Sequence, residues 1–453
     1  MTVIFSAVMT IIIAASRAVI RVTHVVTHAA TRVRSTTSMT IAADGENVKR
    51  AAIAALFKYC TYLGLNGRIR WYTITINGGV SMKYGLVLAG GGVRGACHVG
   101  VWKALLDMKT EISAIAGASI GAINGAIFAQ GDFDRALELW KGISADEIVS
   151  MPDSINNDDN LFDIRNLSDI AKEIYINEGL DMSPLEKLLT SIIDEDKLRK
   201  SPVDFGAAAF SLSRKKEIYK FKSDIPDGEI INYLMASACM PGFRSRIMDN
   251  ERLIDGGVAD NMPAGMLLDS GIRNIITVDV KGAGVYRDFN YAGRNVIRIC
   301  CDEPQTGLMD FDRKGIERSI SEGYIKCMKA FGRYEGGIYA FETDDYRKAR
   351  MRYSDEIISG IEQAARVFGI DNTRSYTVDN LINLTMDEYR RQKSERNEDG
   401  NIFEKIRSLD GKKVVMWLVG MFEKGTDDIM GEKLSVLGAN YDAASAIMYF
   451  NKQ

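Results

Sequence analysis

Three glycine-marked motifs hold the residues of this chain that are suited to chemistry. They are Gly90-Gly91-Gly92-Val93-Arg94-Gly95, Gly117-Ala118-Ser119-Ile120-Gly121 and Asp255-Gly256-Gly257. The second matches G-x-S-x-G, a sharp turn between a strand and a helix that presents a serine hydroxyl as a nucleophile. Its outer residues, Gly117 and Gly121, are glycines because a side chain at either position would crowd the turn. A plain helix N-cap serine is the alternative for Ser119.

A serine nucleophile needs a general base, and the histidine count limits the choice. The chain has three histidines, His24, His28 and His98, and none follows Ser119. Serine hydrolases with this kind of turn place their histidine after the serine. His98 lies among apolar neighbours, which favours packing over catalysis. A carboxylate is therefore the expected base, and burial has to raise its pKa for that role.

The first motif has two interpretations. Glycines between a strand and a helix direct backbone N–H groups outward at a place suited to negative charge. The motif also fits G-x-G-x-x-G, the dinucleotide fingerprint, which requires an acidic residue where the next strand ends. Here that strand ends with Ile115-Ala116-Gly117, and Glu111 stands at its start. A nucleotide-binding module is thus a disfavoured alternative. Asp255-Gly256-Gly257 alone would be an ordinary turn.

Hydrophobic periodicity predicts the elements that position these motifs. Strands at 84–89 and 112–116 alternate with helices at 98–108 and 120–130, which indicates right-handed βαβ units and a parallel sheet covered on both faces. Further strands are expected at 205–212, 218–221 and 274–280, further helices from Ser183 and at 316–331 and 354–367, and a loop at 156–160.

Composition excludes several classes of protein. With 453 residues, 46% hydrophobic and 26% charged, the chain is globular and long enough for two or three domains. The net charge of −3 gives no general reason to expect nucleic acid as a partner. Six cysteines without a C-x-x-C pair predict unlinked thiols in a reducing compartment, and three histidines nearly exclude a histidine-based metal site.

Residues 1–81 differ from the rest of the chain. They hold nine Lys/Arg and two Asp/Glu, whereas the remaining residues hold 48 and 58. The apolar run at 3–15 is too short for a bilayer span and has no preceding positive charge, so it predicts neither a transmembrane helix nor a signal peptide. The Arg-rich, acid-poor start is similar in composition to an organellar transit peptide. Met82 opens a run of residues typical of the start of a domain, which favours an upstream extension over a targeting segment for 1–81. With no convincing signal peptide or transmembrane helix, the expected location is cytoplasmic.

The motifs in this order resemble the patatin-like phospholipase family. The family's glycine-rich loop with arginine, G-x-S-x-G and D-G-[GA] all appear, and the stretches 237–243 and 260–263 also resemble family sequence. The resemblance implies a three-layer α/β/α fold with a mostly parallel central sheet, in a domain at 82–335. A basic extension at 1–81 would precede it, and a mainly helical region at 336–453, of unknown role, would follow.

The resemblance also implies a site and an activity. Ser119 would be the nucleophile and Asp255 the base of a dyad without histidine, and the loop Gly90–Gly95 would supply the oxyanion hole through the N–H groups of Gly91, Gly92 and Val93. Arg94 would anchor that loop, and contact with a substrate phosphate is the alternative. No cofactor or metal is implied.

The implied substrate is a phospholipid or related lipid ester, reached by peripheral contact with a membrane. The resemblance leaves room for a protein activator. A lysophospholipase, a triacylglycerol lipase or an acyltransferase would use the same dyad, and a catalytically idle lipid-binding protein is the alternative from another class. Nucleic acid is not an expected partner.

Overall fold

The computed structural model describes four strands between residues 11 and 76. It then describes residues 82–150, 179–302 apart from 249, 307, 309–395, 411–424 and 438–452. The loop expected at 156–160 lies outside these residues. Contacts divide the chain into two compact units, Met1–Met82 and Lys83–Gln453.

The first unit contains a sheet that the sequence analysis did not predict. Its strands are β1 (Ile11–Ala15), β2 (Ala18–Ala29), β3 (Arg32–Ala43) and β4 (Thr73–Ile76), in that order across the sheet. β2 pairs antiparallel with β1 and β3, and β4 joins β3 in parallel. Val, Ile and Thr are frequent in these strands and suit a pleated surface.

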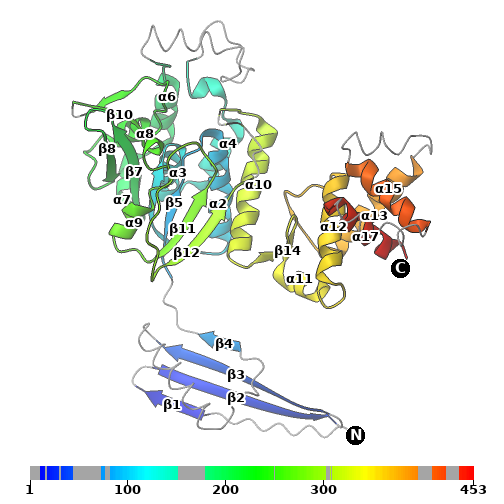
Figure 1. Cartoon of the computed structure of the whole chain (residues 1–453). Coiled ribbons are helices and arrows are strands. Elements are labelled where there is room, and N and C mark those ends of the chain that lie inside the picture. Colours follow the sequence, from blue (N-terminus) through cyan, green and yellow to red (C-terminus); the bar gives the residue numbers. More distant parts are fainter. Residues whose placement is uncertain are drawn as a thin grey trace. The chain divides into compact units, whose positions relative to one another are not determined.

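The second unit is built around an eight-stranded sheet (Figure 1). The order is β12-β11-β5-β6-β7-β10-β9, and β8 also pairs with β7. The strands β12, β11, β5, β6 and β7 pair in parallel, whereas β8, β10 and β9 are added antiparallel. The strand bounds are β5 (Tyr84–Leu88), β6 (Ile112–Ala118), β7 (Asp204–Ser211), β8 (Lys216–Phe221), β9 (Arg246–Met248), β10 (Glu251–Asp255), β11 (Asn274–Asp279) and β12 (Asn295–Cys300).

Helices cover both faces of this sheet. Alternate residues of β5 point to opposite faces, so Leu86 and Leu88 join one core cluster and Val87 joins another. The first cluster packs under α2 (Ala96–Asp107), α3 (Ile120–Gln130), α4 (Phe133–Gly142), α6 (Ser183–Ile192), α7 (Glu195–Lys200), α8 (Ile230–Ser237) and α10 (Arg313–Ala330). The second packs under α9 (Ala264–Asp269). The expected three-layer α/β/α fold with a mostly parallel sheet is therefore confirmed.

The predicted strand–helix order over 84–130 is also confirmed, and it places each motif at a strand end. The glycine loop follows β5 and enters the short 3-10 turn η1 (Gly92–Gly95), while the serine motif joins β6 to α3. Asp255 ends β10. Because β5 and β6 are parallel neighbours, their carboxyl ends meet at one edge of the sheet. β10 runs antiparallel to β7, but its last residue pairs with Ala209 and so reaches the same region.

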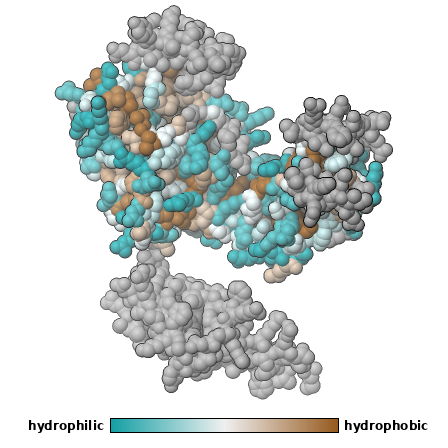
Figure 2. All heavy atoms as spheres, viewed as in Figure 1, coloured by the Kyte–Doolittle hydropathy of each residue, from teal (hydrophilic) through white to brown (hydrophobic). Residues whose placement is uncertain are grey.

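The C-terminal region is mainly helical, as expected. It contains α11 (Thr343–Ala349), α12 (Asp355–Phe368), α13 (Val378–Ser394), α15 (Gly411–Glu423) and α17 (Ala439–Asn451), with a small sheet of β13 (Tyr334–Glu335), β14 (Ala340–Glu342) and β15 (Ser375–Tyr376). These helices enclose their own core, which includes Phe341, Ile361 and Leu381. Over the described residues, the face seen in Figure 2 is largely hydrophilic with several smaller apolar areas, one of them at the upper left near β10.

Candidate active site

Ser119 occupies the strained turn between β6 and α3. Its φ of 54° and ψ of −129° are rare for a residue with a side chain. Gly117 and Gly121 permit this turn because there is no space for a Cβ at either position. A Cβ on Gly117 would overlap the Gly121 backbone, and one on Gly121 would overlap the carbonyl of Leu88. Ser119 is 8% exposed, so little of it remains open to solvent.

A second serine holds this turn in place. The backbone N–H of Ser119 donates a 3.0 Å hydrogen bond to Oγ of Ser237, at the end of α8. The Ser237 hydroxyl in turn donates a 2.6 Å hydrogen bond to the carbonyl of Ala208 on β7. Ser237 is fully buried. Ser237 was expected only as part of the stretch 237–243 that resembles the family, and its contact with Ser119 was not expected, because the two residues are 118 positions apart.

Asp255 faces Ser119 from the end of β10. Its carboxylate accepts hydrogen bonds from the Ser119 hydroxyl and, at 2.7 Å, from the N–H of Gly257. Asp255 is 5% exposed, and this burial raises the pKa of its carboxyl from 3.8 to about 6, although both hydrogen bonds act in the opposite direction. A carboxylate with a pKa near neutrality is suited to take a proton from a hydroxyl.

Asp260, the other buried carboxylate of this region, has a different setting. Its Oδ2 accepts a 2.8 Å hydrogen bond from the Tyr219 hydroxyl on β8. Burial raises the pKa of Asp260, as it does for Asp255. Asp260 lines neither of the two cavities that meet at Ser119, whereas Asp255 lines the wider one.

The glycine loop passes beside Ser119 with its N–H groups available. Gly92 has a φ of 57°, which favours glycine, and a Cβ on Gly91 would press on the side chain of Val280. Within the described residues, no hydrogen bond is donated by the N–H of Gly91, Gly92 or Val93. The first N–H groups of a helical turn lack internal partners, and they attract negative charge.

Hydrogen bonds to two other segments hold this loop. Arg94 donates a 2.6 Å hydrogen bond from Nη1 to the carbonyl of Lys281. Asn261 makes two contacts with Gly90: its Nδ2 donates to the Gly90 carbonyl at 3.1 Å, and its own carbonyl accepts from the Gly90 N–H at 3.1 Å. The sequence analysis noted Asn261 only as part of a stretch that resembles the family.

Two cavities meet at Ser119. One is narrow, with a volume of about 60 Å³ and an apolar lining that includes Ile123, Trp140, Met182, Leu185 and Phe243. The other is an open cleft of about 550 Å³, whose lining includes Gly91, Asp255, Val258, Asn261 and Gly284. Gly92, Met240 and Met309 border both cavities. A molecule with an apolar chain on one side of its reacting carbonyl and a bulkier group on the other fits this arrangement.

Residues 86–268 match the family model described as patatin-like phospholipase. These residues therefore form a patatin-like domain. The match includes Ser119, Asp255 and the glycine loop. It begins inside β5 and ends inside α9, so it covers most of the large sheet.

Curated relatives share this domain at low identity. An uncharacterised NTE family protein of Mycobacterium tuberculosis is 25% identical over 218 residues, which are 48% of this chain and 54% of that protein. The patatin-like phospholipase domain-containing protein 6 of Homo sapiens is 25% identical over 198 residues, 43% of this chain and 13% of that protein. The match thus spans about half of the bacterial relative and a small part of the human one.

Two bacterial structures show weaker likeness. VipD from Legionella pneumophila is 15% identical with a TM-score of 0.35, over 81% of this chain and 88% of VipD. The type III effector ExoU is 11% identical with a TM-score of 0.30, over 81% of this chain and 78% of ExoU. Because these TM-scores are low, the fold of this domain is assigned from its sheet order and from the family match, and not from these two structures.

His98 lies inside the patatin-like domain, on α2, and is fully buried. Burial lowers its pKa to about 3, so the ring is neutral at physiological pH. Its Nδ1 is 3.1 Å from Nδ2 of Asn124, and its Nε2 has no hydrogen-bond partner in the described part of the chain. Because His98 lines neither cavity at Ser119, its position favours packing.

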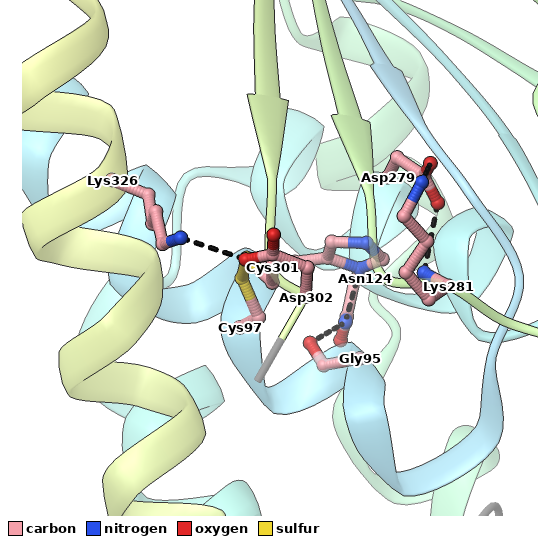
Figure 3. The surroundings of a disulfide bond; sticks show 9 residues. Gly95, Cys97, Asn124, Asp279, Lys281, Cys301, Asp302 and Lys326 are labelled. Atoms are coloured by element: carbon pink, nitrogen blue, oxygen red, sulfur yellow. Dashed lines mark hydrogen bonds and ion pairs between the residues drawn. A yellow bond between two sulfur atoms is a disulfide. The ribbon is translucent and has the colours of Figure 1, made fainter. Parts of the chain in front are cut away.

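Two cysteines of the patatin-like domain are linked, contrary to the expectation of unlinked thiols. Cys97 on α2 and Cys301 just after β12 form a disulfide, with Cα atoms 6.7 Å apart (Figure 3). The expectation of unlinked thiols is therefore wrong for these two residues, because the fold brings together cysteines that are 204 residues apart. Cys239 and Cys327 are free and buried, and burial raises their pKa values to about 11 and about 12.

Two kinds of feature are absent from the described residues. They contain no group of three or more His, Cys, Asp or Glu side chains placed to hold a metal ion. No helix among them is both long and apolar enough to span a bilayer.

Proposed function

We propose that the patatin-like domain is a serine acyl hydrolase that cleaves carboxylic ester bonds of phospholipids or related lipids. The observation that carries this proposal is the hydrogen bond from the Ser119 hydroxyl to the buried Asp255 carboxylate, whose pKa is about 6. This pair lies where an apolar cavity and an open cleft meet.

Acylation is the first half of the proposed reaction. Ser119 Oγ attacks the ester carbonyl while Asp255 takes the hydroxyl proton, which gives a tetrahedral oxyanion. The N–H groups of Gly91, Gly92 and Val93 stabilise that charge, and each such donor is worth about 10²–10³ in rate. The intermediate then collapses: the C–O bond to the alcohol breaks, and the departing alcohol takes the proton from Asp255. The acyl group remains on Ser119 as an ester.

Deacylation repeats these steps with water. Asp255 takes a proton from the water that attacks the acyl carbonyl, and the second oxyanion forms against the same N–H groups. When this intermediate collapses, Ser119 recovers its proton from Asp255 and the fatty acid leaves. A single carboxyl group thus serves as base and then acid in each half of the reaction.

The cavities support a lipid ester as substrate. The narrow apolar cavity suits the carbons of an acyl chain nearest the carbonyl, and the cleft has room for a bulkier part of the lipid. Val258 lines the cleft and is 38% exposed, and Val285, next to the lining residue Gly284, is 49% exposed. Exposed apolar side chains at a cleft opening favour peripheral contact with a membrane, and we assign the domain to lipid breakdown or membrane-lipid remodelling.

Lipid analysis of phospholipid vesicles tests this proposal. Vesicles treated with the full chain should gain free fatty acid and lysophospholipid, and vesicles treated with Ser119→Ala should gain neither. Parallel incubations with lysophospholipid, triacylglycerol, and phospholipid plus an acyl acceptor separate the related activities of this dyad. Equal product from wild type and Ser119→Ala, or no product from any of these lipids, would contradict the proposal.

A further inference from the structure

We propose that Asn124 is a positioning residue that fixes the glycine loop relative to the Ser119 nucleophile. Asn124 lies on α3, the helix that begins directly after Ser119, and is fully buried. It lines neither cavity, so it acts on the reaction through other residues. This inference rests on the proposed function, because it assigns a role within that site.

Asn124 joins three helical elements through one amide group. Its Nδ2 donates a 2.9 Å hydrogen bond to the carbonyl of Gly95, the last residue of the glycine loop, and lies 3.1 Å from Nδ1 of His98. Figure 3 shows Asn124 directed at Gly95. On the other side, Oδ1 accepts a 3.0 Å hydrogen bond from Nε1 of Trp140 on α4.

These partners permit one orientation of the amide. Gly95 offers a carbonyl acceptor and Trp140 offers an N–H donor, so a flipped amide would face an acceptor with its oxygen and a donor with its nitrogen. The neutral His98 ring accepts at Nδ1, which adds a second acceptor on the Nδ2 side. His98 thereby has a structural part in the site: it helps to orient Asn124.

The position of Asn124 explains why the loop needs it. A glycine-rich segment has few side chains to fix its own conformation. Arg94 and Asn261 link the loop by hydrogen bonds to the segments that follow β11 and β10. Asn124 links the other end of the loop, at Gly95, to α3, the helix that begins directly after Ser119. The hydrogen bond to Gly95 therefore sets the spacing between Ser119 and the N–H groups proposed for the oxyanion. Trp140 also lines the apolar cavity, so the same amide is joined to the wall of the proposed acyl site.

Loss of this contact should reduce turnover more than substrate binding. A displacement of about 1 Å at a reacting centre costs about 10² in rate. We expect Asn124→Ala to lower kcat on a soluble short-chain p-nitrophenyl ester about 10- to 100-fold with little change in KM. Second-order labelling by a fluorophosphonate should fall in parallel, since its addition to Ser119 also develops charge on an oxygen. The inflection of the pH–rate profile should not move, because Asp255 is untouched.

Gln130 provides a matched control on the same helix. It is a buried amide at the other end of α3, with hydrogen bonds to Asp132, the Ile192 carbonyl and the Asp194 N–H, and it lines neither cavity at Ser119. Gln130→Ala should lose thermal stability and keep its kcat per active site. Asn124→Asp is a second variant of nearly the same shape, which leaves the Gly95 carbonyl without its N–H donor.

The outcomes separate this inference from the proposed function. If the wild type neither labels nor hydrolyses the ester, the proposed function fails. If the wild type is active and a folded Asn124→Ala or Asn124→Asp has the same kcat and labelling rate as the wild type, the positioning role is overturned. If neither Asn124 variant folds while Gln130→Ala does, Asn124 serves folding alone and the inference is also overturned. A 10- to 100-fold loss of kcat in a folded variant, with Gln130→Ala at the wild-type value, supports it.

Discussion

Asp255 gives the site a pH dependence that a mechanism based on His98 would not share, because the pKa of His98 is far lower. Its carboxyl must be ionised to accept the Ser119 proton, and burial raises its pKa to about 6. We therefore expect kcat/KM on a soluble ester to rise with pH through about 6 and to level off above it. His98, with a pKa of about 3, contributes no inflection there. A profile without an inflection near 6 would contradict the assigned base.

Asp260 allows a direct comparison between two buried carboxylates. Asp255→Asn removes the group proposed to accept the Ser119 proton, so hydrolysis should fall about 10²–10⁴-fold. Asp260→Asn keeps an oxygen that can accept the Tyr219 hydrogen bond and should stay within a few-fold of wild type. Ester hydrolysis by the two purified variants measures this difference. Near-normal turnover by Asp255→Asn would move the role of base to Asp260.

The raised pKa of Asp255 also has a cost in stability. The folded protein holds this proton more tightly than the unfolded chain does, so the free energy of unfolding falls as pH rises from about 4 to about 6. Asp255→Asn removes that charge. It should raise the free energy of unfolding at about pH 8 by on the order of 2–3 kcal/mol, and by little at about pH 4.

Urea unfolding of wild type and Asp255→Asn at both pH values checks this stability effect. Ser119→Ala is the control, because it removes a partner of the carboxylate and leaves the charge in place. An Asp255→Asn protein that is no more stable than wild type at the higher pH would show that burial of the ionised Asp255 carboxylate does not destabilise the fold.

At the residue scale, the motifs predicted only part of the candidate site. Ser119 and the glycine loop were expected because each has a recognisable pattern of residue types along the chain, whereas Asp255 was expected only from the family resemblance. Ser237 and Asn124 have no such pattern, since their partners lie on other elements. Their roles depend on which strands and helices are neighbours, and a single sequence does not contain that information.

At the scale of elements, α2 and α10 pack so closely that two glycines are required. A Cβ on Gly100 of α2 would overlap the carbonyl of Ile320, and one on Gly323 of α10 would overlap the carbonyl of Cys97. We expect Gly100→Ala to lower the free energy of unfolding by about 1–3 kcal/mol, because backbone atoms cannot move aside easily. Chemical denaturation measures this loss.

Gly142, the last residue of α4, is the matched control. No atom lies within 4 Å of a Cβ built there. Gly142→Ala should be neutral or raise the free energy of unfolding by up to about 1 kcal/mol. If the two substitutions had equal effects, the close contact between α2 and α10 would not be present in solution.

The strands differ in how well the sequence predicted them. β5 and β6 were expected because short apolar runs bounded by glycines are typical of buried parallel strands. β12 and the β9–β10 hairpin were not. β12 is an edge strand with mostly half-exposed residues, and β9 has three residues, so neither has a clear hydrophobic period. These edge strands take their place from pairing partners that the local sequence does not specify.

At the scale of the whole chain, residues 1–81 are expected to be dispensable for chemistry. β5 begins at Tyr84, and every residue assigned to the site lies beyond it. A chain that starts at Met82 should fold and hydrolyse soluble short-chain esters at the full-length rate. Each basic residue near an anionic bilayer contributes about 1 kcal/mol to the free energy of membrane binding. Activity on anionic vesicles therefore depends on binding as well as on chemistry, and it is measured separately.

The two assays of the shortened chain have different meanings. A loss confined to anionic vesicles would indicate that the basic segment binds the membrane. A shortened chain that is insoluble, or folded but inactive on soluble esters, would show that residues 1–81 belong to the catalytic domain.

The account as a whole depends on one activated serine with an aspartate base, and mapping of the labelled residue tests this most directly. The full chain is treated with a fluorophosphonate at about pH 8, above the pKa of Asp255, and its peptides are analysed by mass spectrometry. We predict an adduct on Ser119, no labelling of Ser119→Ala and strongly slowed labelling of Asp255→Asn. An adduct on another residue, or labelling of Asp255→Asn at the wild-type rate, would contradict the dyad.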